Sequence, residues 1–443
     1  MSEAHQESIV EFFFGALLRM AWSWRIELFG LATTAGVWAA LRPRIGVQLA
    51  ALLVILAWAL AVAIRPSRRW LAGLLHRADV RREWGHAVRA AAITDYHDQI
   101  PRVIKVWQVP AGDALTVAVP VGGTVLHLEN DAEAMAAVLA IRKVQVTRDP
   151  VNARLGRVVI VRRDPLVLDA PPWPHCEAPT LSLWEPIPVG VGEDGGTVTI
   201  SLPERNVLLG GEPGAGKSAA LSLLVATAAL DPSVKLWLFD GKLVELATWS
   251  GCAEHMVGVD VGEAIQVLRQ LQTEMEVRYA QLLINRKRKV GPDDDMPLQV
   301  VVCDELAHYL TASDRKQRTE FGEVMRDLVS RGRAAGVIVL AATQKPAADI
   351  VPTALRDLFG FRWALRCSTP QASDTILGQG WASAGHSAAE IDAGLRGVGY
   401  LLHEGGQPVR LRSYYLADDT LAGIAFRAEA VRRGETPNGG GSR

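Results

Sequence analysis

Long apolar runs stand near the beginning of the chain. Residues 45–64 form a stretch of 20 residues without a charge (IGVQLAALLVILAWALAVAI), the length that a helix needs to cross the hydrocarbon core of a bilayer. A shorter uncharged run, 28–41, precedes it and has tryptophans near its ends. The two runs predict a transmembrane hairpin within an anchor of residues 1–69, with a single span as the alternative.

Arginines follow the second apolar run. Because positively charged segments stay on the cytoplasmic side, they predict that the rest of the chain faces the cytoplasm from the cell membrane. Residues 70–95 then form an arginine-rich helical connector. The arginines are Arg65, Arg68, Arg69, Arg77, Arg81, Arg82 and Arg89.

The middle of the chain alternates short apolar segments with one helical pattern. The strands and the helix occur in the order ββαββ, which predicts a small α+β domain within residues 96–188. A proline-rich stretch, 165–188, ends this part and is typical of a linker. The expected strands are 102–109, 114–119, 143–147 and 157–163, and the helix is 131–141.

Beyond residue 189 the pattern changes to buried-strand runs separated by helical segments. This alternation predicts an α/β domain with a mostly parallel sheet covered on both faces, over residues 189–415. Residues 416–443 are interpreted as a C-terminal tail. The expected strands are 206–209, 234–239, 298–303, 337–342 and 361–367.

Composition changes this picture little. The 443 residues are 49% hydrophobic and 21% charged, which excludes a wholly disordered chain. Lysine plus arginine number 47 against 48 acidic residues, so the net charge of −1 by itself indicates no partner. The four cysteines lie far apart, which argues against a disulfide framework or a zinc site.

A glycine-rich loop follows the strand at 206–209 and precedes a helix. It satisfies the pattern G-x-x-x-x-G-K-[ST], whose backbone N–H groups surround phosphate oxygens at a helix N-terminus. Lys217 is expected to reach the β- and γ-phosphates of ATP, and the Ser218 hydroxyl to ligate Mg²⁺. The candidate nucleotide-binding residues are Gly211, Glu212, Pro213, Gly214, Ala215, Gly216, Lys217, Ser218 and Ala219.

Acidic and polar side chains follow two later strands. Asp304 and Glu305 end the run LQVVVC, at the strand end where parallel α/β sheets bind ligands. We expect Asp304 to hold Mg²⁺ and Glu305 to orient and deprotonate the attacking water. Thr343 and Gln344 end the strand at 337–342, where Gln344 is a candidate γ-phosphate sensor or a simple loop cap.

Four separated blocks resemble the FtsK/SpoIIIE family of membrane-anchored, hexameric double-stranded DNA translocases. The resemblance covers residues 185–405 in the family's order and spacing, although Gly241 stands where the family usually has proline. The blocks are GGEPGAGKS (210–218), FDGKLVEL (239–246), EMEVRY (274–279), and CDELAHYL (303–310) continued by SRGRAAGVIVLAATQKP (330–346).

The resemblance implies a RecA-like motor that hydrolyses ATP with Mg²⁺ and pumps double-stranded DNA through a homohexameric ring. It implies that Arg362 reaches the nucleotide of the neighbouring subunit, with Arg331 and Arg333 as rival candidates. Within the second block, structural bracing and catalysis both remain open for Asp240, Lys242 and Glu245.

The densest basic run of the expected motor lies at 286–289 (Arg286, Lys287, Arg288 and Lys289). It is a candidate for contact with DNA or with a neighbouring subunit, and a solvated loop is the alternative. Because phosphate contacts need basic groups but no base readout, DNA binding is expected to be sensitive to salt and nearly blind to sequence.

The chain departs from the family's chromosome-segregating members, since it has at most two spans and no long linker. It resembles more closely the short TraB/TraSA-like transfer proteins of actinobacterial plasmids and integrative elements, which implies conjugative DNA transfer alongside other transfer proteins. Alternatives are a type VII-like protein-export ATPase, a chromosome-segregation translocase, an ATPase that pumps single-stranded DNA with a relaxase, and a non-hydrolysing scaffold.

Overall fold

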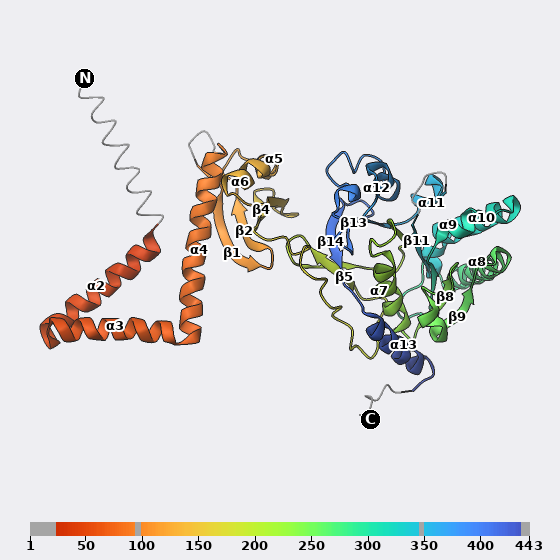
Figure 1. Cartoon of the computed structure of the whole chain (residues 1–443), viewed down its shortest axis with the longest axis horizontal. Coiled ribbons are helices and arrows are strands. Elements are labelled where there is room, and N and C mark those ends of the chain that lie inside the picture. The colour runs from red at the N-terminus through yellow and green to blue at the C-terminus, as the bar shows by residue number, and fades with distance from the viewer. Residues whose placement is uncertain (1–23, 94–98, 345–349, 436–443) are drawn as a thin grey trace, which may run out of the picture. The chain divides into compact units, whose positions relative to one another are not determined.

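The computed structural model describes residues 24–93, 99–344 and 350–435. The chain divides into two compact units, Met1–Arg163 and Asp164–Arg443 (Figure 1). The boundary lies upstream of the expected one at residue 188. The reason is that Leu166, Trp173 and Leu183 of the proline-rich stretch are buried in clusters of the second unit.

Among its described residues, the first unit has three long helices, a four-stranded antiparallel sheet and two short helices between its strands. Its elements are α2 (Arg25–Ile45), α3 (Val47–Ala63), α4 (Arg65–Ala90), β1 (Arg102–Val109), β2 (Gly112–Ala118), α5 (Val125–Asn130), α6 (Ala132–Val138), β3 (Lys143–Arg148) and β4 (Leu155–Val161).

Helices α2 and α3 carry the apolar runs and contact each other. Helix α2 continues through Pro43, and the chain turns at Gly46 (φ 82°). Among the described residues, no single helix is both long and apolar enough to span a bilayer. One pair of helices bent by 90°, 47–61 with 65–90, satisfies the length and composition requirement when taken together.

The small sheet has the order β1-β2-β4-β3. Apolar side chains on one of its faces, among them Leu115 and Ile160, form a cluster with Trp84 and Val88 of α4. The helix expected at 131–141 corresponds to α6, and α5 before it is a second helix that the sequence pattern did not predict. The helices cover this face because alternate residues of each strand point towards it.

The second unit contains a ten-stranded sheet. Its elements are β5 (Ile187–Gly192), β6 (Thr197–Ile200), β7 (Val207–Gly210), α7 (Lys217–Ala229), β8 (Val234–Phe239), η1 (Ala247–Cys252), β9 (Ala253–Val257), α8 (Val261–Ile284), β10 (Leu298–Cys303), α9 (Leu306–Leu310), α10 (Arg315–Arg331), η2 (Gly332–Ala335), β11 (Val337–Thr343), α11 (Thr353–Arg356), β12 (Phe361–Leu365), α12 (Pro370–Leu377), η3 (Ala388–Glu390), β13 (Val398–His403), β14 (Val409–Ser413) and α13 (Asp418–Arg432).

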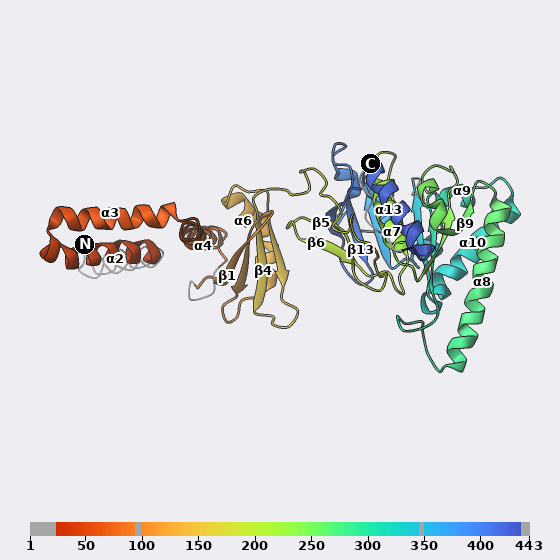
Figure 2. The same cartoon turned by 90° about the horizontal axis from the view of Figure 1, so that it is seen from below.

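The strand order of this sheet is β6-β5-β14-β13-β12-β7-β11-β10-β8-β9. The six strands from β12 to β9 pair in parallel, and the remaining four are antiparallel. Helices lie on both faces (Figure 2). The expected α/β fold with a mostly parallel sheet is therefore confirmed, with an antiparallel extension that the sequence pattern did not predict.

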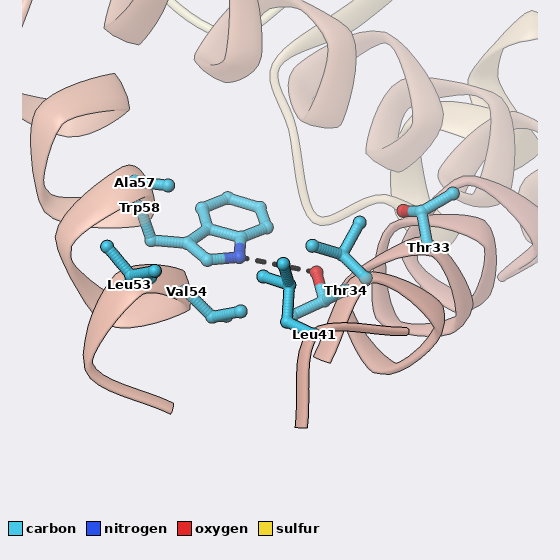
Figure 3. A pocket seen from close by; sticks show the side chains of 8 residues that line it. Thr33, Thr34, Leu41, Leu53, Val54, Ala57 and Trp58 are labelled. Atoms are coloured by element: carbon cyan, nitrogen blue, oxygen red, sulfur yellow. Dashed lines mark hydrogen bonds between the residues drawn. The ribbon is translucent and has the colours of Figure 1, made fainter. Parts of the chain in front are cut away.

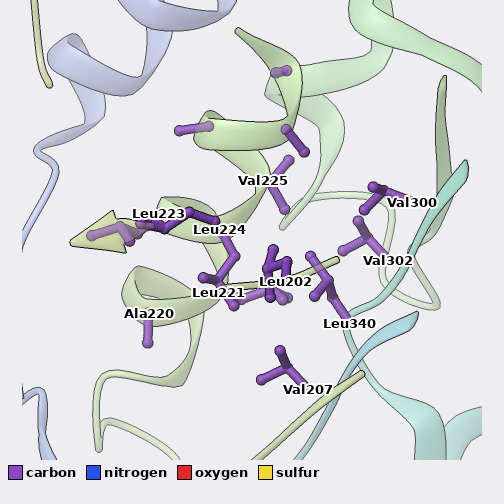
Figure 4. Packing of buried hydrophobic residues seen from close by; sticks show 14 of the residues in the cluster. Leu202, Val207, Ala220, Leu221, Leu223, Leu224, Val225, Val300, Val302 and Leu340 are labelled. Carbon is purple, nitrogen blue, oxygen red and sulfur yellow. The ribbon is translucent and has the colours of Figure 1, made fainter. Parts of the chain in front are cut away.

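Two apolar layers hold the helices on the sheet. Leu209, Val300 and Leu340 point to the face covered by α7 and belong to one cluster, part of which is drawn in Figure 4. Their neighbours Leu208 and Val301 point to the other face and pack with α8 and α10. Burial of each such side chain contributes about 1.5–3 kcal/mol, which explains why unbroken apolar runs form the central strands.

The interpretation of 416–443 as a tail is wrong for its first part. Residues 418–432 form α13, whose Ile424 and Ala428 are fully buried in the core beside α7. The Arg432 guanidinium donates hydrogen bonds to the carbonyls of Ala229 (3.3 Å) and Val234 (2.7 Å). Residues 436–443 lie outside the described part of the chain.

Candidate phosphate-binding site

The glycine-rich loop lies between β7 and α7, at the carboxyl end of a central strand. Gly214 and Gly216 have φ values of 77° and 102°, which L side chains rarely adopt. A Cβ on Gly216 would also lie 2.7 Å from the Gly397 nitrogen. The Gly397 N–H in turn donates to the Ala215 carbonyl (2.9 Å), so a segment distant in sequence supports the loop.

Lys217 and Asp304 form a buried ion pair. The Lys217 ammonium donates to Asp304 Oδ1 (2.8 Å) and to the Asp304 carbonyl (2.9 Å). The Lys217 side chain is 3% exposed and that of Asp304 is 0% exposed. The structure thus brings together the lysine of the loop and the first carboxylate after β10, as the sequence predicted for a nucleotide site.

The remaining carboxylate oxygen at this position, Asp304 Oδ2, is buried and has no hydrogen-bond partner among the described residues. A buried carboxylate oxygen close to a phosphate-binding lysine suits a hard cation such as Mg²⁺. Within the described ranges, no group of three or more His, Cys, Asp or Glu side chains could hold a metal ion by itself. Ser218, phosphate oxygens and water would supply the other ligands of such an ion.

Glu305 is held by the neighbouring strand. Its Oε1 accepts a hydrogen bond from Thr343 Oγ1 (2.9 Å), and its two oxygens accept the Gln344 N–H at 3.2 and 3.1 Å. The structure therefore brings together Glu305 and Gln344. It is the backbone of Gln344, however, that makes this contact, and the Thr343 hydroxyl makes the shortest of the three hydrogen bonds.

Arg366 is a residue at this site that the sequence analysis missed. Its guanidinium forms an ion pair with Glu212 of the loop (2.6 Å), and its carbonyl accepts the Glu212 N–H (3.0 Å). Arg366 follows β12, which pairs in parallel with β7. The only signal in the sequence was its position directly after an apolar run, because the pairing of β12 with β7 is a tertiary property.

The three arginines considered as trans contacts lie elsewhere. On β12, Arg362 is paired with Leu208 of β7. The glycine-rich loop begins only after Gly210, which is paired with Ala364. Arg362 contacts Asp357 (3.4 Å), and burial lowers the pKa of its guanidinium. Arg331 and Arg333 precede β11 and contact Glu276 (2.6 Å) and Glu404 (3.2 Å), respectively. Within one chain, the described residues place none of these three arginines at the glycine-rich loop.

The second block braces the edge of the sheet. Asp240 is fully buried, and its carboxylate accepts the backbone N–H groups of Lys242, Leu243 and Leu246 at 2.8–3.0 Å. Its hydrogen bonds therefore shape the loop after β8. The Lys242 side chain is exposed and that of Glu245 is half-buried.

The third block braces α8. The buried Arg278 donates to Glu274 (2.9 Å) and to the Ala335 carbonyl (2.9 Å). Glu274 also accepts from Gln299 (2.6 Å), the second residue of β10. These hydrogen bonds fix α8 against the strand that ends at Asp304, so the block supports the site without entering it.

The basic run 286–289 follows α8 and precedes β10, at the amino end of the parallel strands. Lys287 forms an ion pair with Asp294, and Lys289 one with Glu204. Arg286 and Arg288 are exposed. The run therefore lies at the edge of the sheet opposite to the phosphate loop.

A loop of this pattern between strand and helix, with an acidic strand end beside it in a parallel sheet, defines a P-loop NTPase domain. The chain also matches the family model "FtsK/SpoIIIE family" over residues 135–295, which include the phosphate loop. Over these residues it is thus similar to the FtsK/SpoIIIE family, as its sequence blocks indicated.

Curated relatives agree with this assignment. DNA translocase FtsK of Corynebacterium glutamicum is 29% identical over 279 residues, which are 57% of this chain and 29% of that protein. DNA translocase FtsK of Staphylococcus aureus strain Mu50 is 27% identical over 53% of this chain and 32% of its own length. The chain therefore spans about a third or less of the length of the relatives that it matches.

A solved structure shares the fold. The conjugation coupling protein TcpA of pCW3 superposes with a TM-score of 0.53 at 17% identity, over 80% of this chain and 99% of that chain. At this identity the likeness extends to the fold alone.

Proposed function

We propose that the protein is a membrane-anchored, ATP-driven translocase that pumps double-stranded DNA through a homohexameric ring. The observations that carry this proposal are the match to DNA translocases FtsK over 57% of the chain, the family-model match over the phosphate loop, and the buried contact between Lys217 and Asp304. The chain has Lys217, Ser218, Asp304 and Glu305 at the positions that the hydrolytic roles require. This favours a motor over a scaffold that binds ATP without hydrolysing it.

Lys217, Ser218, Asp304 and Glu305 would divide the work of ATP hydrolysis. On nucleotide binding, Lys217 exchanges its contact with Asp304 for the β- and γ-phosphates. Ser218 and Asp304 then hold Mg²⁺, which neutralises phosphate charge when bound. Glu305 orients the attacking water and accepts its proton. Arg362 of a neighbouring copy is our candidate for stabilising the transition state in trans.

Conjugative transfer of a plasmid or an integrative element is the duty that we propose for the translocase. Support comes from the fold shared with a protein described as a conjugation coupling protein, nearly all of which is covered by this chain. The motor would then act with other transfer proteins of the same element.

We propose that α2 and α3 anchor the ring in the cell membrane, with the motor domain on the cytoplasmic side. Large apolar side chains of α3 are exposed, including Leu52 (62%), Ile55 (65%) and Leu60 (59%). Between the two helices lies an apolar pocket, at which Trp58 Nε1 donates to Thr34 Oγ1 at 3.3 Å (Figure 3). A bilayer would cover these surfaces, whereas water would leave them exposed.

ATP hydrolysis by the purified full-length chain tests the proposal. We expect double-stranded DNA to stimulate the rate well above single-stranded DNA, and Lys217→Ala to abolish hydrolysis with either. The mutation removes the ammonium that would contact the phosphates. A wild-type rate indifferent to both nucleic acids would contradict the DNA motor and favour the protein-export alternative.

A further inference from the structure

Thr343 contacts both parts of the candidate site, the phosphate loop and Glu305. Its hydroxyl donates to Glu305 Oε1 (2.9 Å), and its carbonyl accepts the N–H of Gly211, the first glycine of the phosphate loop (3.3 Å). The residue is 1% exposed and ends β11 in register with Gly210. One buried residue therefore contacts both the loop and the second carboxylate.

The strand order indicates towards which neighbouring strand the Glu305 carboxylate points. β11 lies between β7, which leads into the phosphate loop, and β10, which leads into Glu305. A carboxylate that follows β10 and bonds to the end of β11 leans towards the phosphate loop, not towards β8 on its other side. The Gln344 N–H binds the same carboxylate, which restricts the rotation of the Glu305 side chain.

We infer that Thr343 is a positioning residue for ATP hydrolysis: its hydroxyl sets the orientation of Glu305 relative to the phosphate loop. The inference rests on the proposed function and concerns the step after nucleotide binding. A carboxylate free to rotate would deprotonate water less often in the required geometry, although the loop would still bind nucleotide.

Two substitutions isolate the hydroxyl. Thr343→Val keeps the β-branched shape and removes the donor, while Thr343→Ser keeps the donor. Thr227→Val is a matched control, because Thr227 is also buried and its hydroxyl donates to the Leu223 carbonyl (3.0 Å) inside α7. The assays are the ATPase rate of the full chain with double-stranded DNA and the binding of a fluorescent ATP analogue with Mg²⁺.

We expect Thr343→Val to lower kcat about tenfold or more while the dissociation constant of the analogue stays within about twofold. Thr343→Ser should restore at least about half of the wild-type kcat, and Thr227→Val should stay within about twofold of wild type. A Thr343→Val enzyme with near-normal kcat would overturn the inference. So would a serine variant as slow as the valine variant.

Thermal unfolding separates this inference from the proposed function. If the wild-type chain hydrolyses no ATP, the proposed function fails, yet the contact can still be measured in the nucleotide-free protein. The losses in Tm caused by Thr343→Val and Glu305→Ala should then be less than additive in the double variant. Strictly additive losses would show that the two side chains do not interact, and the inference would be wrong.

Discussion

The contact between Lys217 and Asp304 couples stability to nucleotide binding. In the nucleotide-free chain the ammonium and the carboxylate neutralise each other in a fully buried position. A bound nucleotide would compete for the lysine with its phosphates. Nucleotide binding would therefore replace the Asp304 contact of Lys217 with phosphate contacts.

Asp304→Asn should destabilise the nucleotide-free protein by about 3 kcal/mol, because it leaves the buried Lys217 ammonium without a counter-charge. The double variant Lys217→Met/Asp304→Leu should recover much of that loss, since it removes both charges. Thermal melting of the wild type and the two variants measures this. An Asp304→Asn protein that melts with the wild type would show that the ammonium finds solvent or another partner.

At the scale of elements, helix α13 completes the core of the second unit. Its buried face packs beside α7, and Arg432 binds carbonyl groups at the end of that helix. Helix α7 begins at the phosphate loop, so α13 supports the site from behind although it lies far away in the sequence.

A stop after Leu416, which removes α13, should expose the apolar surface that Ile424 and Ala428 cover and leave an aggregation-prone protein. A stop after Glu435 leaves α13 whole and serves as the matched control; it should melt within about 1 °C of the full chain, because no described contact is lost. Soluble yield and Tm report both outcomes. Equal behaviour of the two truncations would contradict the role given to α13.

At the scale of the whole molecule, the proposed motor separates its tasks between two edges of one sheet. Nucleotide chemistry belongs to the carboxyl ends of the strands. The exposed Arg286 and Arg288 lie at the amino ends, where a basic surface is available for the backbone of DNA.

Arg286→Ala/Arg288→Ala should weaken double-stranded DNA binding equally for unrelated sequences. It should also reduce the slope of log K against log salt by about 1–2, because phosphate contacts release counterions. Arg315→Ala/Lys316→Ala removes the same charge from exposed positions at the start of α10 and should leave the slope unchanged. Titrations with labelled duplexes at several salt concentrations measure these slopes. Identical slopes for both variants would exclude the basic run 286–289 as a DNA contact.

Sequence by itself determined the parts of this protein that are contiguous. The loop from Gly211 to Ser218 and the pair Asp304 and Glu305 could be predicted because each is a short motif at the end of an apolar run. The central strands could be predicted because burial on both faces demands unbroken apolar residues. The membrane hairpin and the ring remain predictions of the same kind.

Tertiary structure alone decided which of these parts meet. Thr343 and Glu305 are separated by 38 positions, and they touch because β11 inserts between β7 and β10. Arg366 reaches Glu212 because β12 pairs with β7, and Gly397 contacts the loop from the chain just before β13. Local patterns specify which residues form a strand. Strand order results from the packing of all helices and strands together, so it cannot be predicted from a short stretch of sequence.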